Sequence, residues 1–134
     1  MTERTASCSC GQLTVRVSGE PVRVSICHCL ACQRRTGSVF GEQVRFKKED
    51  IKEISGQSTL YVRVGDEGSE INFRFCPTCG ATVYYTINND QNLVAIPVGA
   101  FADPTFQTPT RSVYESRKHG WVNVPDGPDV VHLD

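Results

Sequence analysis

The chain has 134 residues, of which 39% are hydrophobic and 22% charged, and its formal net charge at pH 7 is −1. A chain of this length forms one domain and buries roughly 65 to 70% of the surface that its unfolded form exposes. Because the charge is near zero and no basic block or stripe is visible, nothing electrostatic favours a nucleic acid or an anionic membrane as partner.

Short stretches with the two-residue period of a half-buried strand recur along the chain. They predict about eight strands, at residues 12–18, 22–26, 38–46, 60–64, 70–75, 81–87, 93–98 and 112–116. The segment 51–54 is too short to assign. Many short strands of this kind predict a mainly β domain with mostly antiparallel sheets.

The segments between these strands are rich in turn-forming residues. Gly19-Glu20-Pro21 separates the first two strands, which predicts a hairpin. Residues 33–36 before Gly37 suit one short helical turn closed by glycine. The mixed charges of residues 47–50 indicate a solvated turn. The tail from Gly99 contains several Pro-based turns and one last predicted strand.

The seven cysteines are the main chemical signal. Residues 1–10 lack the apolar core of a secretory signal, and no apolar run approaches the ~20 residues of a membrane helix, so we expect a cytosolic protein. Reducing compartments disfavour disulfides, and an odd count leaves one thiol unpaired. The cysteines therefore indicate metal or redox chemistry, and they divide naturally into four and three.

Two short knuckles carry four of the cysteines. Cys8-Ser9-Cys10-Gly11 and Cys76-Pro77-Thr78-Cys79-Gly80 each place glycine directly after the second thiol. Glycine there admits the positive φ that a chain turning tightly around a metal requires. Two such knuckles predict one closed site, although Cys8 and Cys10 are alternatively stray thiols near a frayed terminus. Structural zinc contributes ~10 kcal/mol or more in model peptides.

The other three cysteines lie within six residues, Cys27-His28-Cys29-Leu30-Ala31-Cys32. Three thiolates around tetrahedral zinc leave a fourth position for water or substrate. With one thiolate fewer, this site is less charge-saturated than the four-cysteine site, so it accepts a further donor more readily. A thiol substrate suits that position, because zinc would hold it as a nucleophilic thiolate at neutral pH. The same openness predicts a labile second metal.

Few other side chains qualify as site residues. In an extended segment His28 points opposite Cys27 and Cys29, which favours a structural role over a ligand. Arg34 and Arg35 either attract a substrate carboxylate beside the metal or form a solvated helix face. His119 and Trp121 either line a pocket or, as is usual for an isolated Trp, serve packing.

Four motifs together match a known pattern. They are C-x-C-G at 8–11, C-H-C-x2-C at 27–32 followed by R-x-T-G-S and Phe, F-C-P-x-C-G at 75–80, and G-A-F-x-D-P at 99–104. With these motifs the chain resembles the glutathione-dependent formaldehyde-activating enzyme (GFA) family, also called the centromere protein V domain family. The resemblance covers about Ser7 to Trp121, and all seven cysteines fall on motif positions.

The resemblance implies a β-tent zinc fold and a single GFA-type zinc domain over residues 1–134, with an ordered core at about 7–124. It also implies two zinc ions per chain. The structural ion would be held by Cys8, Cys10, Cys76 and Cys79, and the catalytic ion by Cys27, Cys29 and Cys32. One position departs from the pattern, because the family often has a histidine near Arg111, whereas this chain places His119 closer to Trp121.

Two functions of different classes remain open. The resemblance implies a carbon–sulfur lyase-type enzyme similar to S-(hydroxymethyl)glutathione synthase, which joins glutathione or a related thiol to formaldehyde or a small aldehyde. Arg34, Arg35 and Trp121 are its candidate substrate residues, and a homodimer is a further prediction. The alternative is a non-catalytic zinc module that binds a protein. The complete set of motifs favours the enzyme.

Overall fold

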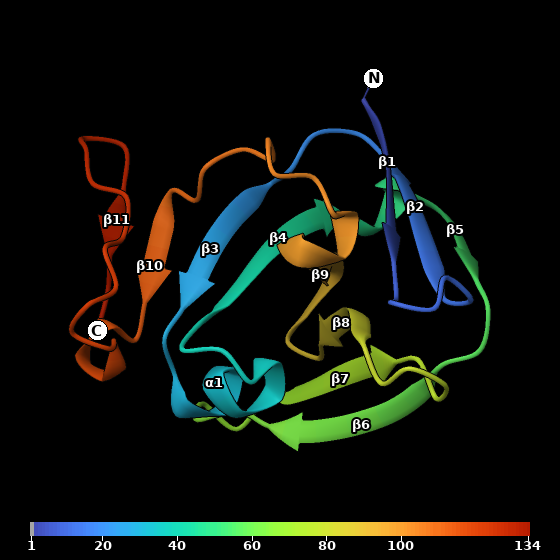
Figure 1. Ribbon diagram of the computed structural model, residues 1–134, viewed down its shortest axis with the longest axis horizontal. Coiled ribbons are helices and arrows are strands. Elements are labelled where there is room, and N and C mark those ends of the chain that lie inside the picture. The colour runs from blue at the N-terminus through green and yellow to red at the C-terminus, as the bar shows by residue number, and fades with distance from the viewer. Residues whose placement is uncertain (1) are drawn as a thin grey trace.

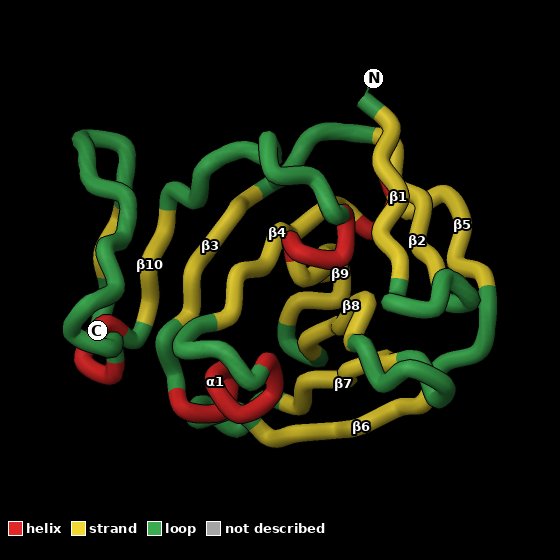
Figure 2. Tube along the Cα trace, in the orientation of Figure 1, coloured by secondary structure: helices red, strands yellow, loops and turns green. Residues whose placement is uncertain are grey.

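The computed structural model describes residues 2–134, which form eleven strands in two sheets, one α-helix and three 3-10 turns (Figures 1 and 2). The smaller sheet, in the order β1-β2-β5, contains β1 (Glu3–Ser7), β2 (Thr14–Ser18) and β5 (Ile51–Ser55). The larger sheet runs in the order β11-β10-β3-β4-β9-β8-β7-β6. Its strands are β3 (Arg23–Cys27), β4 (Gly41–Lys47), β6 (Thr59–Val64), β7 (Glu70–Phe75), β8 (Thr82–Ile87), β9 (Asp90–Pro97), β10 (Arg111–Val113) and β11 (Val131–His132).

Helical structure is confined to four short segments, which are α1 (Leu30–Thr36) and the 3-10 turns η1 (Lys48–Asp50), η2 (Val98–Phe101) and η3 (Glu115–Arg117). The predicted mainly β class with one short helix is therefore confirmed. Pairing is antiparallel except at the edge of the larger sheet, where β10 runs parallel to both β3 and β11. The helix begins three residues earlier than predicted, directly after Cys29, and Gly37 ends it with φ +71°.

The predicted hairpin between the first two alternating segments is wrong. β2 pairs with β1 and β5 in the smaller sheet, whereas β3 pairs with β4 and β10 in the larger one. An alternating pattern specifies that one face of a strand is buried, but it does not specify the neighbouring strand. The segment after Gly19 therefore leads from one sheet to the other.

Three strands are present that the pattern did not predict. β1 alternates weakly in sequence, β5 covers the segment left unassigned, and β11 is two residues long. Each lies at the edge of its sheet. Edge strands are held mainly by backbone hydrogen bonds to one neighbour, so their side chains carry little periodic signal. Regular structure thus extends beyond residues 7–124 in both directions.

The main hydrophobic core lies between the two sheets. One face of the larger sheet contributes buried residues such as Val44, Phe46 and Ile96, and the smaller sheet faces them with Val15 and Val17. Side chains alternate along a strand, so the residues between these core positions point to the other face of the larger sheet. That second face carries the cavity described below.

Candidate metal centres and the adjoining cavity

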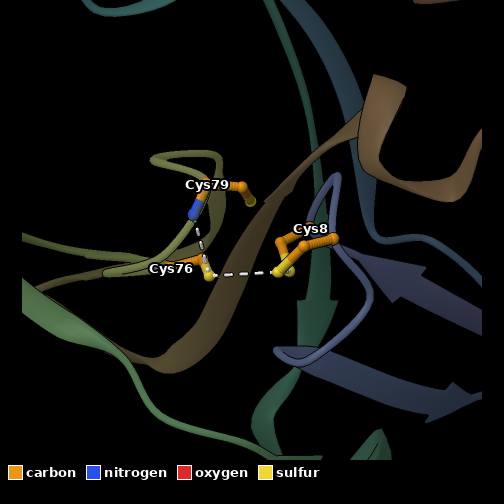
Figure 3. A group of neighbouring side chains, drawn as sticks. Cys8, Cys76 and Cys79 are labelled. Atoms are coloured by element: carbon orange, nitrogen blue, oxygen red, sulfur yellow. Dashed lines mark hydrogen bonds between the residues drawn. The ribbon is translucent and has the colours of Figure 1, made fainter.

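The first cysteine cluster joins the end of β1 to the turn between β7 and β8. Cys8 and Cys10 follow β1, and Cys76 and Cys79 come from the turn between β7 and β8, so that the two knuckles face each other (Figure 3). The Cys10 sulfur lies 3.6 Å from both the Cys8 and the Cys76 sulfurs. Tetrahedral zinc with bonds of 2.3 Å places its sulfur ligands about 3.8 Å apart. The cluster therefore fits a four-thiolate metal site.

The chain around these sulfurs donates several hydrogen bonds to them. Cys76 accepts from the Gln12 side chain at 3.0 Å and from the backbone amides of Thr78 and Cys79 at 3.3 and 3.4 Å. Burial raises the pKa of Cys76, but these donors outweigh it and lower that pKa to about 5. The amide of Leu13 donates to Cys8 at 3.3 Å. Donors aimed at sulfur stabilise the thiolates that a metal requires.

Glycine has the role in both knuckles that the sequence predicts. Gly11 has φ +86° and Gly80 has φ +82°, and their amides donate to the carbonyls of Cys8 and Cys76 at 3.2 and 2.8 Å. A side chain at either position would oppose this left-handed backbone. The knuckles thus close around the sulfurs as expected.

The second cluster lies where β3 ends and α1 begins. Cys27 is the last residue of β3, Cys29 caps the helix, and Cys32 lies in its first turn. Their three sulfurs lie within 4.8 Å of one another. The Cys29 sulfur accepts a hydrogen bond from the Cys32 amide at 3.3 Å. This donor set also fits a tetrahedral metal, with three protein ligands.

The three thiols of this cluster differ in pKa. Hydrogen bonds from the Cys27 and Cys32 thiols lower the pKa of Cys29, with the Cys32 amide and Arg63 acting in the same direction. The converse hydrogen bonds to Cys29 and Cys32, together with burial, raise the pKa of Cys27. Cys27 and Cys32 are buried whereas Cys29 is half-buried. Cys29 is therefore the sulfur best suited to carry negative charge.

His28 points away from this cluster, as alternation predicts. It is fully buried, its Nε2 lies 2.9 Å from the Ser112 hydroxyl, and the Gln33 side chain donates to its carbonyl. Burial lowers the pKa of His28, which favours the neutral ring. His28 therefore connects β3 to β10 rather than to the metal site.

A cavity of about 580 Å³ opens beside the three-cysteine cluster. All three cysteines line it, together with Tyr85 of β8. Five arginines also line it, from four strands and the η3 turn, and these are Arg23, Arg45, Arg63, Arg111 and Arg117. The four-cysteine cluster lies outside this lining. The cavity is large enough for a small ligand and gives it access to the three-cysteine cluster.

The predicted substrate residues Arg34, Arg35 and Trp121 are not part of the cavity lining. Arg34 is exposed on α1, Trp121 is 70% exposed, and neither lines the cavity. Arg35 lies over the rings of Phe73 and Tyr85, 5.3 and 5.4 Å from their centroids, and it too is outside the lining. With so much of its side chain exposed, Trp121 contributes little to packing among the described residues.

His119 is exposed beside the helix. Its Nε2 lies 3.1 Å from the Gln33 side-chain oxygen, and it is not part of the cavity wall. This histidine therefore contacts the outer side of α1.

The cavity-lining arginines and Tyr85 were not singled out from the sequence. One signal was present, because Arg23, Ser25 and Cys27 alternate along β3 and so share the face that ends in the cysteine cluster. The contributions of β4 and β8 depend on strand pairing, which no local pattern reveals. Arg45 and Tyr85 therefore become recognisable only in the folded chain.

The comparison with family models decides the relationship. The model described as "Glutathione-dependent formaldehyde-activating enzyme" matches residues 3–117. The chain belongs to this GFA family. The match contains both knuckles and the three-cysteine cluster, so every candidate metal ligand lies within the family region.

A solved structure supports the fold of this GFA chain. A crystal structure of a Rhodobacter sphaeroides protein aligns with a TM-score of 0.57 and 21% identity, over 75% of this chain and 91% of the other. At that identity the likeness concerns the fold alone. No curated protein matches the chain. Within residues 2–134, the helices lack the length and apolar character needed to cross a membrane.

Proposed function

We propose that this GFA-family chain is a zinc-dependent enzyme that joins a glutathione-like thiol to formaldehyde or a related small aldehyde. In the reverse direction the reaction is that of a carbon–sulfur lyase. The observation that carries the proposal is the position of Cys27, Cys29 and Cys32 on the wall of the 580 Å³ cavity. A non-catalytic zinc module needs only closed sites and gives no reason for this opening.

The two clusters would hold zinc ions with different roles. Cys8, Cys10, Cys76 and Cys79 supply a complete tetrahedral set and suit a structural zinc ion. The three cysteines beside the cavity suit a catalytic zinc ion, which would supply an open position that keeps a substrate thiol deprotonated at neutral pH. The cavity then determines which thiols reach that position.

The reaction conserves atoms and charge without a further reactant. The thiol releases its proton, its sulfur forms a bond to the aldehyde carbon, and the C=O π pair moves to the oxygen, which takes up a proton. Tyr85 lines the cavity, and burial raises its pKa to about 12, so its phenol keeps its proton at neutral pH. A protonated phenol there is suited to donate a hydrogen bond to the oxygen that gains charge.

Native mass spectrometry with and without glutathione tests the metal assignment. We expect two zinc ions per chain, with glutathione binding to, or displacing, only one of them. Addition of ¹³C-formaldehyde to glutathione should then give the hydroxymethyl thioether signal faster with protein than without it. A single tightly held zinc that does not respond to thiols, or an unchanged rate, would contradict the proposal.

A pair of substitutions separates the two clusters. Cys29→Ser removes a ligand from the open site only, so the variant should fold, hold one zinc ion and lose at least about a hundredfold in rate. The matched variant Cys79→Ser breaks the closed site and should lose the fold, because structural zinc supplies ~10 kcal/mol or more. Circular dichroism and zinc content distinguish the two variants. Equal unfolding of both would mean that the clusters are not divided as proposed.

A further inference from the structure

Arginine is the most frequent charged residue in the cavity lining. Five arginines line the cavity, against three acidic residues, Asp66, Glu67 and Asp134, all of which are exposed. Arg63 is held over the ring of Phe73 at 5.1 Å, and Arg117 lies 5.8 Å from the ring of Tyr114. Within residues 2–134, Arg23, Arg45 and Arg111 form no such aromatic contact. These three form the arginine wall considered below.

The arginine wall is built from three adjacent strands of the larger sheet. Arg23 of β3 lies directly opposite Arg45 of β4. Arg111 of β10 lies opposite Ser25, which is two residues from Arg23 and therefore on the same face of β3. All three side chains line the cavity. The register itself thus brings three positive charges together.

The described residues form no ion pair with this wall. None of its three arginines has a carboxylate within ion-pair distance in residues 2–134, where the ion pairs involve Arg4, Arg16 and His132. The Nε of Arg23 is buried without a hydrogen-bond partner. Burial lowers the pKa of Arg23, and the charges of Arg45 and Arg111 lower it further, against a weaker opposite effect of Asp90.

This arrangement costs the free chain stability. Like charges directly opposite each other on antiparallel strands are destabilising, and a buried guanidinium nitrogen without an acceptor adds to the cost. An anion in the cavity would offset both, because guanidinium groups bind carboxylates or phosphates through charge-assisted hydrogen bonds. The wall therefore has the properties of a binding site for more than one acid group.

The same strand connects the arginine wall to the cysteines. Arg23 and Cys27 lie on one face of β3, four residues apart, which corresponds to about 13 Å along a strand. Extended arginine side chains span part of that distance. A small molecule can therefore reach the cysteine cluster with one end and the arginine wall with the other.

We propose that Arg23, Arg45 and Arg111 bind the acid groups of a small thiol that carries at least two carboxylates, and so select the substrate by charge. This inference deepens the proposed function and rests on it only for the thiol end of the ligand. The acid groups bind whether or not the sulfur reacts.

Three probes separate the two ends of the ligand on the zinc-loaded protein. Glutathione has a thiol and two carboxylates, S-methylglutathione keeps the carboxylates but blocks the thiol, and cysteamine has a thiol without any acid group. Calorimetric titration should show that Arg23→Gln and Arg45→Gln weaken glutathione and S-methylglutathione at least about tenfold, since each loses charge-assisted hydrogen bonds. Cysteamine binding should not weaken, because its ammonium group is repelled by these arginines.

Arg74→Gln is the matched control, because Arg74 lies on β7 outside the cavity lining. It should leave all three affinities unchanged. Loss of glutathione binding in Arg34→Gln but not in Arg23→Gln would overturn the inference and favour the exposed helix face instead. Equal effects of Arg74→Gln and Arg23→Gln would overturn it as well, since they would indicate a general charge effect.

The outcomes keep this inference and the proposed function apart. If S-methylglutathione binds through the arginines but no thiol reaches the metal, the arginine wall stands and the proposed function fails. If cysteamine and glutathione bind the metal with affinities that are the same in the wild-type protein, Arg23→Gln and Arg45→Gln, the inference about the arginine wall is wrong and the proposed function stands. Absence of binding by both glutathione and S-methylglutathione overturns the inference.

Thermal stability supplies a readout that a structural role would not give. Relief of the repulsion in Arg23→Gln should raise the Tm of the ligand-free protein by about 1 to 4 °C. Saturating glutathione should raise the Tm of the wild-type protein more than that of the variant. A fall in Tm with unchanged ligand affinity would show that Arg23 serves the fold and would overturn the proposal.

Discussion

The two cysteine clusters differ in the number of sulfurs and in the N–H donors that orient them. Cys76 accepts three N–H donors, whereas Cys29 accepts one backbone donor. Burial does not separate the clusters in the same way, because Cys10 and Cys79 are exposed whereas Cys27 and Cys32 are buried. Hydrogen bonds to sulfur orient metal ligands, and a complete set of four sulfurs leaves no open position, so the first cluster suits a permanent metal and the second leaves room for a ligand.

Gly56 lies against the backbone of Gln12, whose side chain contacts the four-cysteine cluster. Its φ is +99°, and a Cβ built there would lie 1.9 Å from the Gln12 carbonyl oxygen. The Gln12 side chain in turn binds Cys76 and the backbone of Gln57. A side chain at position 56 would therefore displace the segment that holds Gln12.

We predict that Gly56→Ala destabilises the protein by about 3 kcal/mol or more, since it combines backbone strain with a clash against backbone. Gly68→Ala is the matched control, because Gly68 has φ +83° with open space around it and should cost only about 1 kcal/mol. Urea unfolding of the zinc-loaded proteins measures both. Equal costs would show that the backbone at Gln12 yields easily.

At the scale of elements, β3 organises the cavity. Its core-facing residue Val24 packs between the sheets, while Arg23, Ser25 and Cys27 face the cavity. The strand then passes directly into the helix cap at Cys29. Part of this is predictable from sequence, because the alternation and the position of Cys27 at a strand end are local properties. Its pairing with β4 and β10 is not local.

The last strand, β11, is held by two ionic contacts of His132 and a few backbone bonds. His132 Nδ1 lies 2.7 Å from Glu115 and its Nε2 lies 3.5 Å from Asp126. The hydrogen bond to Glu115 raises the pKa of His132, burial opposes this shift, and the charges of Glu115 and Asp126 raise the pKa further. Both contacts are partly exposed, so their contribution to stability is modest.

The raised pKa gives the attachment of β11 a defined pH dependence. Stabilisation by protonated His132 is complete below the unfolded-state pKa of about 6.5 and is lost as pH rises through the higher folded-state value. Hydrogen-exchange protection of the Val131 and Leu133 amides, which bond to Thr110 and Ser112, should therefore fall with rising pH. In His132→Gln this decrease should disappear. A pH dependence that persists in His132→Gln would contradict the prediction.

At the scale of the whole molecule, the four-cysteine cluster links the two sheets. Cys8 and Cys10 follow the first strand of the smaller sheet, and Cys76 and Cys79 lie between two strands of the larger one. A metal at this junction crosslinks residues far apart in sequence and so restricts the unfolded chain. The three-cysteine cluster spans only six residues and offers no such link.

We therefore predict that a chelator removes zinc in two steps. The ion at Cys27, Cys29 and Cys32 should leave first without loss of β-sheet signal, because it has three protein ligands instead of four and does not crosslink the sheets. Release from the four-cysteine cluster should then coincide with unfolding, since it removes ~10 kcal/mol or more. Zinc release and circular dichroism followed together measure both steps.

Cys29→Ser is the control for the chelator experiment and should show only the second step. Unfolding that accompanies the first zinc in the wild-type protein would contradict the prediction. A two-step release in Cys29→Ser would also contradict it, because one of the two ions would then be bound elsewhere.

Local chemistry in the sequence determined the parts of this protein that depend on near neighbours. Cysteine spacing predicted both clusters, the glycines after the two knuckles supported the first of them, and period-two alternation predicted most strands. Tertiary structure alone decided that β2 and β3 belong to different sheets and that Arg23, Arg45 and Arg111 meet in one wall. Periodicity indicates which face of a strand is buried, whereas strand partners follow from the packing of the whole chain.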